Sequence, residues 1–469
     1  MNYKFFSITI IFLSFIFIAA SAQDSSKSKS PLDRKAKMDK MREQKMERMK
    51  DLKKGRNATG SLDNALANPA GVKNLIVRGE SLTSLTPRIK ELIDLERLDL
   101  SNNQLTDLPK ELAQLTNLRE LKLNDNKFAN IPAVVFQLQN LEVLEFTNNE
   151  ISNIPADINK LVRLRKFAVN GNKINSMQGE FSPMESLREM DLSGNSLSSI
   201  PECIFSARYL TIFNLSNNSI NTINSKIINL KSLANLNLEA NNLSSVPKEF
   251  GELPSLRHLN LRKNSLNSLE DDFANMPKLS HLDISENSLT NFPAHISKLP
   301  SLRSLTISST GLKELPDVIT TIENLQELNI DGNQISALPK SFEKLASLKI
   351  LSAKSNQFKE LPDVLTQMTS IVQIDFSDNK ITSIGASISK LEKLQTLNLN
   401  QNEITVLPSE ISGMKDLRNL SLADNKIKNV PQGLDNLQQL RVITLKGNPV
   451  TDETKESVKK MLPKARIIF

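Results

Sequence analysis

One asparagine recurs every 23 residues over most of this chain. It stands at Asn103, Asn126, Asn149, Asn172, Asn195, Asn218, Asn241, Asn264, Asn287, Asn333, Asn356, Asn379, Asn402, Asn425 and Asn448, and Thr310 fills the one gap. A further copy of the surrounding pattern precedes the first asparagine and carries Glu80 in its place, which makes 17 copies without an insertion. A strict period of this length indicates a solenoid of equivalent coils, each of which packs only against its neighbours.

Each copy reads L-x-x-L-x-L-x-x-N-x-L-x-x-L-P-x-x-I-x-x-L-x-x and divides into two halves. The L-x-L centre alternates, so it predicts a short strand with Leu98 and Leu100 pointing into the core. Proline stands six residues after the asparagine in eleven copies, and proline prevents a long helix from continuing. We therefore predict an α/β solenoid with a parallel sheet on its concave side and short 3₁₀ or irregular segments on its convex side.

The asparagine follows the strand, where the chain turns. A buried turn leaves backbone groups without partners, and each such group costs about 1–3 kcal/mol. An Asn side chain holds both a donor and an acceptor, so it can bond its own turn and the next one. The repeated residues predict a ladder of amides, in which Thr310 is the weakest internal rung.

This repeat resembles the leucine-rich repeat of the 23-residue L-P-x-x-I-x-x-L type, over residues 61–469. That type occurs in intracellular scaffolds such as Scribble and Erbin, and in exported bacterial proteins, notably those of spirochaetes. Two end segments are similar to the bacterial group. SLDNALANPAGVKNLIV (61–77) resembles its helical N-terminal cap, and GNPVTDETKESVKKMLPKARIIF (447–469) resembles its C-terminal cap of a helix and a strand. The resemblance implies a horseshoe with a cap at residues 61–71, a solenoid at 72–450 and a second cap at 451–469.

The first 22 residues have the pattern of a signal peptide. An apolar run from Phe5 to Ile18 is followed by Ala20-Ser21-Ala22, a small-residue cleavage site. The alternative is an uncleaved anchor, although the run is short for a membrane span. The residue directly after the cleavage site is not a cysteine, which disfavours a lipoprotein. We expect an exported protein, located in the periplasm, at the cell surface or outside the cell.

Residues 23–60 form a charged, methionine-rich linker, which we expect to be partly helical or disordered. Its segment 24–56 holds 13 Lys and Arg against 6 Asp and Glu, a net charge of +7. The whole chain is also +7 and Lys4 belongs to the signal peptide, so residues 57–469 have a net charge of −1. Two interpretations of the segment remain: a solvated spacer, or an attachment to an anionic membrane, surface or partner helix. A body without net positive charge argues against a nucleic-acid partner.

The concave sheet should display the residues beside each L-x-L, such as Arg97, Asp99, Ser101 and Asn102. These columns contain no aromatic residue. Long charged and imidazole side chains concentrate on three coils, which form our candidate binding patch: Glu239, His258, Asn260, Arg262, Lys263, His281, Asp283 and Glu286. Arg262 is the predicted anchor, because a guanidinium can bond a carboxylate bidentately. His258 and His281 should be strand neighbours. The favoured interpretation is two exposed imidazoles, and the alternative is a weak metal site with Asp283.

The sequence contains no catalytic constellation, glycine-rich phosphate loop or zinc signature, so we expect neither an enzyme nor a cofactor. Cys203 is the single cysteine, either a small filler on the convex side or a site of intermolecular disulfide formation. We predict an exported binding module that contacts a protein partner through its concave face. The alternative function is a structural envelope or surface protein attached through residues 24–56.

Overall fold

The computed structural model describes residues 58–59, 61–178, 184–269, 273 and 275–469. The chain divides into two units, 1–59 and 60–469, and the second contains the repeats. The predicted signal peptide and the basic segment 24–56 lie outside the described residues.

The repeat unit is a long parallel sheet in which every coil adds one strand. From β2 to β20 each residue pairs with the residue 23 positions further along, whereas β20 pairs with β21 at an offset of 24. The inner sheet of the unit therefore has the period of the sequence. The strands are β1 (Ala58–Thr59), β2 (Asn74–Ile76), β3 (Arg97–Asp99), β4 (Glu120–Lys122), β5 (Val143–Glu145), β6 (Asn153–Ile154), β7 (Lys166–Ala168), β8 (Ser176–Met177), β9 (Glu189–Asp191), β10 (Ile212–Asn214), β11 (Asn235–Asn237), β12 (His258–Asn260), β13 (His281–Asp283), β14 (Ser304–Thr306), β15 (Glu327–Asn329), β16 (Ile350–Ser352), β17 (Gln373–Asp375), β18 (Thr396–Asn398), β19 (Asn419–Ser421), β20 (Val442–Thr444) and β21 (Arg466–Ile468), of which β6 and β8 pair separately.

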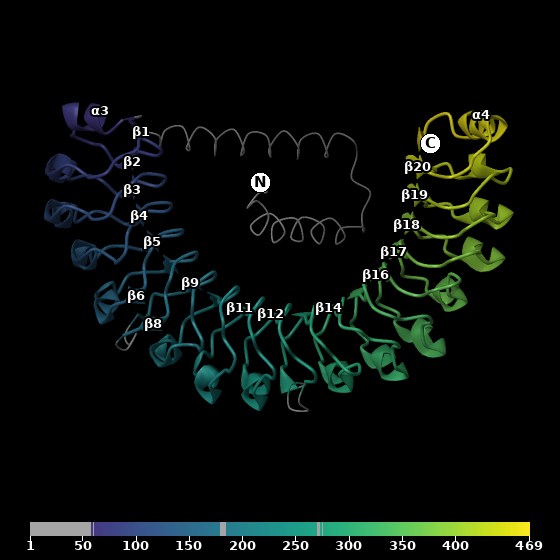
Figure 1. Ribbon diagram of the computed structural model, residues 1–469, viewed down its shortest axis with the longest axis horizontal. Coiled ribbons are helices and arrows are strands. Elements are labelled where there is room, and N and C mark those ends of the chain that lie inside the picture. The colour runs from purple at the N-terminus through teal and green to yellow at the C-terminus, as the bar shows by residue number, and fades with distance from the viewer. Residues whose placement is uncertain (1–57, 60, 179–183, 270–272, 274) are drawn as a thin grey trace, which may run out of the picture. The chain divides into compact units, whose positions relative to one another are not determined.

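Short 3₁₀ helices return the chain along the outer side of the arc (Figure 1). Most begin directly after the repeated proline, whose fixed φ suits the N-cap position. The predicted horseshoe, with its concave parallel sheet and short convex segments, is confirmed. The 3₁₀ helices are η1 (Pro87–Glu91), η2 (Lys110–Gln114), η3 (Ala133–Gln137), η4 (Ala156–Lys160), η5 (Glu202–Ser206), η6 (Ser225–Asn229), η7 (Lys248–Glu252), η9 (Ala294–Lys298), η10 (Asp317–Thr321), η11 (Lys340–Lys344), η12 (Asp363–Gln367), η13 (Ala386–Lys390), η14 (Ser409–Gly413) and η15 (Leu434–Asn436).

A short α-helix covers each end of the core. Helix α3 (Leu62–Ala67) starts at Ser61, whose hydroxyl accepts the Asn64 N–H at 3.2 Å. Helix α4 (Asp452–Met461) starts at Thr451, which caps it in the same way. Both helices bury apolar side chains against the terminal coils, because those coils would otherwise expose a core face to water.

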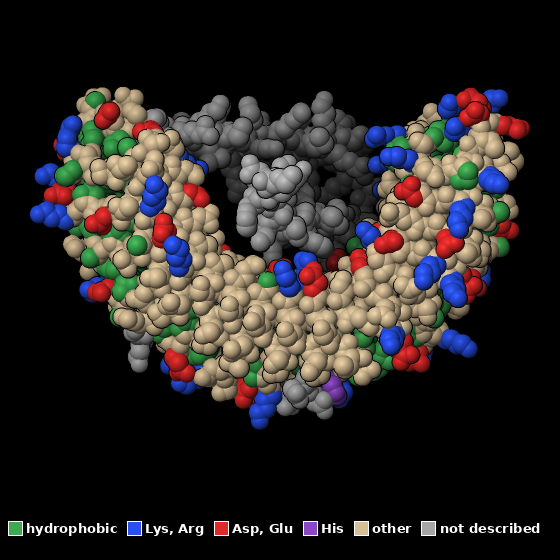
Figure 2. Space-filling view, viewed as in Figure 1, with side chains coloured by type: hydrophobic (Ala, Val, Ile, Leu, Met, Phe, Trp, Pro, Cys, Tyr) green, Lys and Arg blue, Asp and Glu red, His purple; other side chains and the backbone are tan. Residues whose placement is uncertain are grey.

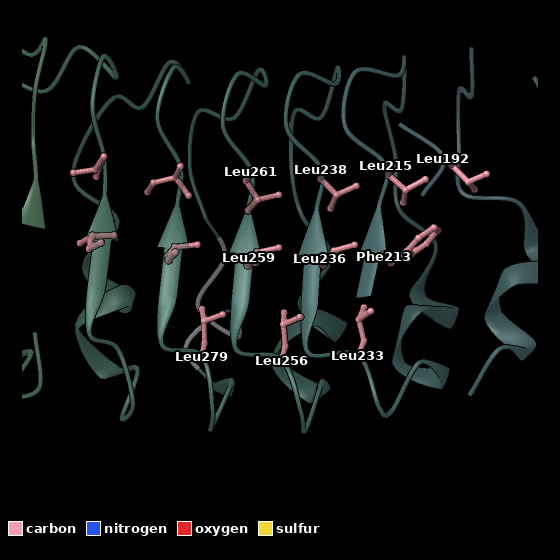
Figure 3. Close-up of a cluster of buried hydrophobic side chains, with 14 of the residues drawn as sticks. Leu192, Phe213, Leu215, Leu233, Leu236, Leu238, Leu256, Leu259, Leu261 and Leu279 are labelled. Carbon is pink, nitrogen blue, oxygen red and sulfur yellow. The ribbon is translucent and has the colours of Figure 1, made fainter. Parts of the chain in front are cut away.

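The core consists of columns of leucine that run from coil to coil (Figure 3). Leu256, Leu259 and Leu261 occupy three such columns, and all three are at most 2 % exposed. Phenylalanine fills some positions, and the rings of Phe128 and Phe146 meet edge to face with centroids 5.3 Å apart. The phenylalanines named here are therefore packing residues of the interior.

The repeated asparagines join each coil to the one before it. Asn103 Nδ2 donates to the carbonyl of Leu100 in its own turn at 2.9 Å and to that of Val77 in the preceding coil at 2.8 Å. Its Oδ1 accepts the N–H of Leu82, also in the preceding coil, at 3.1 Å. The same three bonds recur at the other repeated asparagines, for example Asn241 and Asn425. The ladder thus runs toward the preceding coil, whereas the sequence suggested the next coil.

The residue before each ladder position adopts a left-handed conformation. The φ values there lie between 51° and 76° from Gly79 to Gly447, and the column includes Asn102, Lys263 and Glu286. Side chains other than glycine, asparagine and aspartate rarely adopt this conformation. The shared geometry of the turn therefore overrides the preference of the individual residue.

Thr310 makes only part of the ladder. Its hydroxyl donates to the carbonyl of Ile307 at 3.3 Å and to Asn333 Oδ1 at 3.1 Å. Within the part of the chain that the structure describes, no side-chain hydrogen bond of Thr310 reaches the preceding coil.

We expect Thr310→Asn to stabilise the solenoid by about 1 kcal/mol, because it would restore the hydrogen bonds to the coil before. Denaturant unfolding of the two proteins measures the difference. Thr290→Asn, at an exposed position of the preceding coil, is the control and should change stability by less than about 0.5 kcal/mol. A destabilised T310N protein would show that this turn cannot accommodate the amide.

Candidate functional site

The predicted patch residues lie together on three neighbouring coils of the concave face. His258 and Asn260 are on β12, and they pair in register with His281 and Asp283 on β13. Glu239 follows β11, while Arg262 and Lys263 follow β12 and Glu286 follows β13. The structure therefore brings all eight residues to one region, and His258 and His281 are strand neighbours as predicted. In Figure 2, basic and acidic side chains lie next to each other on the inner rim at the middle of the arc.

Arg262, the predicted anchor, is already paired with carboxylates of its own chain. Its guanidinium forms an ion pair with Glu286 on one side and approaches Glu239 Oε1 to 3.6 Å on the other. Its backbone N–H also donates to Asn260 Oδ1 at 2.9 Å. Glu286 is the left-handed residue of the turn that follows β13. Through its pairs with Glu239 and Glu286, Arg262 connects three coils. A partner would meet a preformed charged network here.

Asp283 and the two histidines do not converge on a common point. The carboxylate of Asp283 accepts the N–H of Ser285 at 2.9 Å and its hydroxyl at 2.5 Å, and burial raises the pKa of Asp283. The rings of His258 and His281 stack face to face, with centroids 4.4 Å apart and planes inclined by 22°. Among the described residues, no group of three His, Cys, Asp or Glu is placed to hold a metal ion. The geometry therefore does not support the alternative metal site.

Two polar atoms in the middle of the patch lack partners among the described residues. They are Nδ1 of His258 and Oδ1 of Asn235, which belong to neighbouring strands. Burial, together with the adjacent His281 and Arg257, lowers the pKa of His258 to about 4. His258 is therefore neutral at pH 7 and can donate or accept a hydrogen bond. Buried polar atoms usually have partners, so these two are an exception among the described residues.

Two concave residues that we expected to be exposed are buried. Asp99 is 7 % and Ser101 3 % exposed, whereas Arg97 and Asn102 are exposed as expected. Arg78 reaches over from the preceding coil to bond the Asp99 carboxylate, which also accepts the Ser101 N–H at 3.1 Å. Because long side chains cross between neighbouring coils, a residue of a concave column is not necessarily accessible.

A continuous chain of ion pairs occupies the N-terminal third of the concave face. It extends from β3 to β9, with separations between 2.9 and 3.8 Å, through Arg97, Glu120, Lys122, Glu145, Lys166 and Glu189. Each charge is partly exposed, so a single pair contributes little to stability. The chain nevertheless neutralises this part of the face and leaves few free charges there for a partner.

Sequence reasoning missed an aromatic residue at the rim of the sheet. Tyr209 is 46 % exposed and Ile212, on the same coil, is 40 % exposed. The Arg188 guanidinium carbon lies 5.2 Å from the centre of the Tyr209 ring, and an Arg188 N–H donates to the carbonyl of Glu185 at 2.7 Å. Tyr and Arg are favoured at interface hot spots. Tyr209 is one of only two tyrosines in the chain, and that rarity could have indicated it.

Cys203 is a buried residue of η5 on the convex side. Burial raises the pKa of its thiol to about 11, so the thiol stays protonated at neutral pH. A buried, protonated thiol is poorly placed to form an intermolecular disulfide, which favours the filler interpretation.

Among the described helices, none is both long and apolar enough to span a bilayer.

Comparisons with known proteins agree with this architecture. The model of the leucine-rich repeat region matches residues 45–191 and 290–377, and a second leucine-rich-repeat model matches five windows between residues 185 and 450. No curated protein shows significant similarity to the chain.

Solved structures of leucine-rich-repeat proteins are also similar. A leucine-rich-repeat protein of Leptospira interrogans is 33 % identical, covers 88 % of this chain and all of its own, and has a TM-score of 0.74. The plant peptide hormone receptor RGFR1, solved in complex with RGF2, is 29 % identical, with 81 % of this chain and 63 % of the receptor chain covered and a TM-score of 0.59. The Drosophila Toll–Spätzle complex shares the fold at 23 % identity and a TM-score of 0.69, over 80 % of this chain and 54 % of its own. The chain belongs to the leucine-rich-repeat family.

Proposed function

We propose that this protein is an exported, non-enzymatic binding module that contacts a protein partner through its concave face. The observation that carries the proposal is the network of Glu239, Arg262 and Glu286, whose partly exposed charges lie together on the inner side of three neighbouring coils. Repeat solenoids in general bind partners on their extended concave surfaces.

The candidate binding patch is too small to form the whole interface, so it would form the middle of one. A standard interface buries about 20–30 residues on each side, which requires more than three coils. The parallel sheet provides them, since every coil presents side chains at the same height as its neighbours. One of the similar structures, the plant receptor RGFR1, was solved in complex with RGF2. This complex supports a protein partner.

The test compares capture of a partner by the mature protein and by three variants. In the first variant His258, Arg262 and Lys263 are changed to Ala. The second lacks residues 24–56, and the third carries Lys340→Ala and Lys344→Ala on convex helix η11 as a control. We expect the patch variant to lose capture by at least about tenfold, because it removes central charged groups of the interface, while the control is unchanged. Full binding by the patch variant together with loss in the truncated one would instead indicate a surface protein attached through its basic segment.

Export depends on the signal peptide at residues 1–22. We expect the exported protein to begin at Gln23, because the apolar run is followed by the small residues that signal peptidase accepts. N-terminal sequencing of protein recovered outside the cytoplasm measures this directly. An intact Met1 in the recovered protein would contradict cleavage and favour an uncleaved anchor.

A further inference from the structure

Nine cationic side chains stand directly before a strand, at the edge of the concave sheet where the strands begin. Two of them, Lys73 and Arg119, form ion pairs with Glu96 and Glu142. We call the other seven the basic row: Arg165, Arg188, Arg257, Arg303, Lys349, Arg418 and Arg441. The backbone fixes their spacing, since the N–H of one such residue bonds the carbonyl of the equivalent residue one coil earlier. This bond measures 2.9 Å from Arg188 to Arg165 and 2.8 Å from Arg441 to Arg418. The backbone hydrogen bonds of the sheet therefore hold neighbouring members of the row at a fixed spacing.

No member of the basic row forms an ion pair with a residue that the structure describes. This distinguishes the row from the inner face, where Lys122, Lys166 and Arg262 are all bound to carboxylates. The same column contains two acidic residues, Glu96 and Glu142, and both are paired with column neighbours of opposite charge. Six members of the row are exposed and Arg418 is half-buried. Apart from Arg188, which donates to the Glu185 carbonyl and lies against the Tyr209 ring, the row offers cations that the described part of the protein leaves available.

The basic row lies within a wider basic strip of the repeat unit. The strip comprises three positions in each coil between residues 162 and 441. They are the two turn residues before the first apolar residue of the repeat and the one residue after that apolar residue. It contains thirteen basic and four acidic residues, although residues 57–469 have a net charge of −1. The basic members are Arg163, Arg165, Arg188, Arg208, Lys231, Arg257, Lys278, Arg303, Lys349, Lys393, Lys415, Arg418 and Arg441, and the acidic ones are Glu185, Glu323, Glu392 and Asp416. One edge of an otherwise balanced solenoid is strongly positive.

The spacing in the middle of the row suits an extended polypeptide. Arg257, Arg303 and Lys349 alternate with the neutral Ser280 and Gln326, so successive cations are two strands apart, about 9.6 Å. A polyproline II helix has three residues per turn and rises about 9.3 Å over them. An acidic residue at every third position of such a segment would therefore meet one cation after another. The hydroxyl of Ser280 donates to the Arg257 carbonyl at 3.1 Å, which keeps the space between the cations open.

Other polyanions fit this edge less well. Proteins that bind single-stranded nucleic acid combine cations with aromatic faces on which bases stack, and Tyr209 is the aromatic residue beside the row. Guanidinium groups, which form most of the row, bond carboxylates and phosphates alike in bidentate geometry, so the spacing of the cations is what favours the acidic peptide.

We propose that the basic row binds an extended acidic segment of a protein partner, with carboxylates at every third residue along Arg257, Arg303 and Lys349. The proposal deepens the concave-face binding role and rests on it for its biological setting. Its test uses a defined peptide, so it can fail or succeed independently of that role.

The experiment measures binding of a labelled peptide of about five Glu-Pro-Pro repeats. The row variant carries Arg257→Ser, Arg303→Gln and Lys349→Gln, residue types that the same column uses in other coils. The control variant carries Lys298→Ser, Lys340→Gln and Lys390→Gln on convex helices, and loses the same charge. We expect the row variant to bind at least about tenfold more weakly and the control within about twofold, with parent binding weakened by added salt.

Several outcomes would overturn the proposal. Equal binding by the row variant, or equal loss in the control, would show that the row is not the site. Equal affinity for a peptide of the same composition with its glutamates clustered would contradict the spacing. Alginate or oligothymidylate binding as tightly as the peptide would show a general polyanion site. The central-patch variant should retain peptide binding, so its failure to capture a partner would concern the proposed function alone.

Discussion

Asn241→Ala is expected to destabilise the solenoid by about 3 kcal/mol, because one buried N–H is left unpaired at a cost of about 1–3 kcal/mol and two further hydrogen bonds are lost at about 0.5–1.5 kcal/mol each. Its side chain, 6 % exposed, donates to the carbonyls of Leu215 and Leu238 at 3.0 Å each and accepts the N–H of Ile220 at 3.0 Å. Two of these three partners belong to the preceding coil. Alanine would leave the Ile220 N–H without a partner, while the Leu215 and Leu238 carbonyls would each keep one bond, from Asn218 and Asn264.

The adjacent residue supplies a matched control. Asn242 is the same amino acid one position later, but it is exposed. Asn242→Ala should change stability by less than about 0.5 kcal/mol. Denaturant unfolding of both variants gives the comparison. Equal losses would mean that the repeated amide does not hold the coils together and that the ladder has another role.

The second large effect is a loss of stability in acid. Because the pKa of His258 is about 4 in the folded protein and 6.5 ordinarily, the unfolded chain binds more protons between these values. Stability should therefore be full above pH 6.5, fall as the pH drops toward 4, and level off below it. A shift of this size corresponds to about 3 kcal/mol, and screening by solvent at this half-exposed ring reduces the expectation to about 1–2 kcal/mol.

Comparison of variants isolates this histidine from the many carboxylates that also titrate. His258→Asn introduces the residue that β11 carries at the same register position, and it should flatten the unfolding free energy between pH 6.5 and 4. Should the parent and His258→Asn proteins lose stability in parallel over this range, the stacked ring would not be responsible.

The repeat made the fold predictable to an unusual degree. The spacing of Leu98, Leu100 and Asn103 determines which residues enter the core, where the chain turns and how successive strands align. The repeated proline similarly determines the 3₁₀ segments. These features depend on local residue types that recur in every coil, so one copy of the pattern carries the information for all.

The surface was predicted less well, because its contacts join side chains of neighbouring coils that are not part of the repeated pattern. The pairing of Arg262 with Glu286 joins residues 24 positions apart and requires the left-handed turn that lifts Glu286. The burial of Asp99 requires Arg78 to fold across it. The alternation of Arg257, Arg303 and Lys349 is visible in the sequence, but their lack of ion-pair partners among the described residues is a property of the assembled arc.

The direction of the amide bonds has a consequence for how such a chain can change its length. Because each asparagine bonds equivalent atoms of the coil before it, removing or duplicating one whole 23-residue unit would present every remaining amide with the same partners. Any other number of residues would place an amide against the wrong carbonyls across one boundary. Insertion or deletion of whole repeats can therefore lengthen or shorten the arc by one coil at a time. The length of the surface that a partner can contact would change in the same steps, while the contacts of the core stay the same.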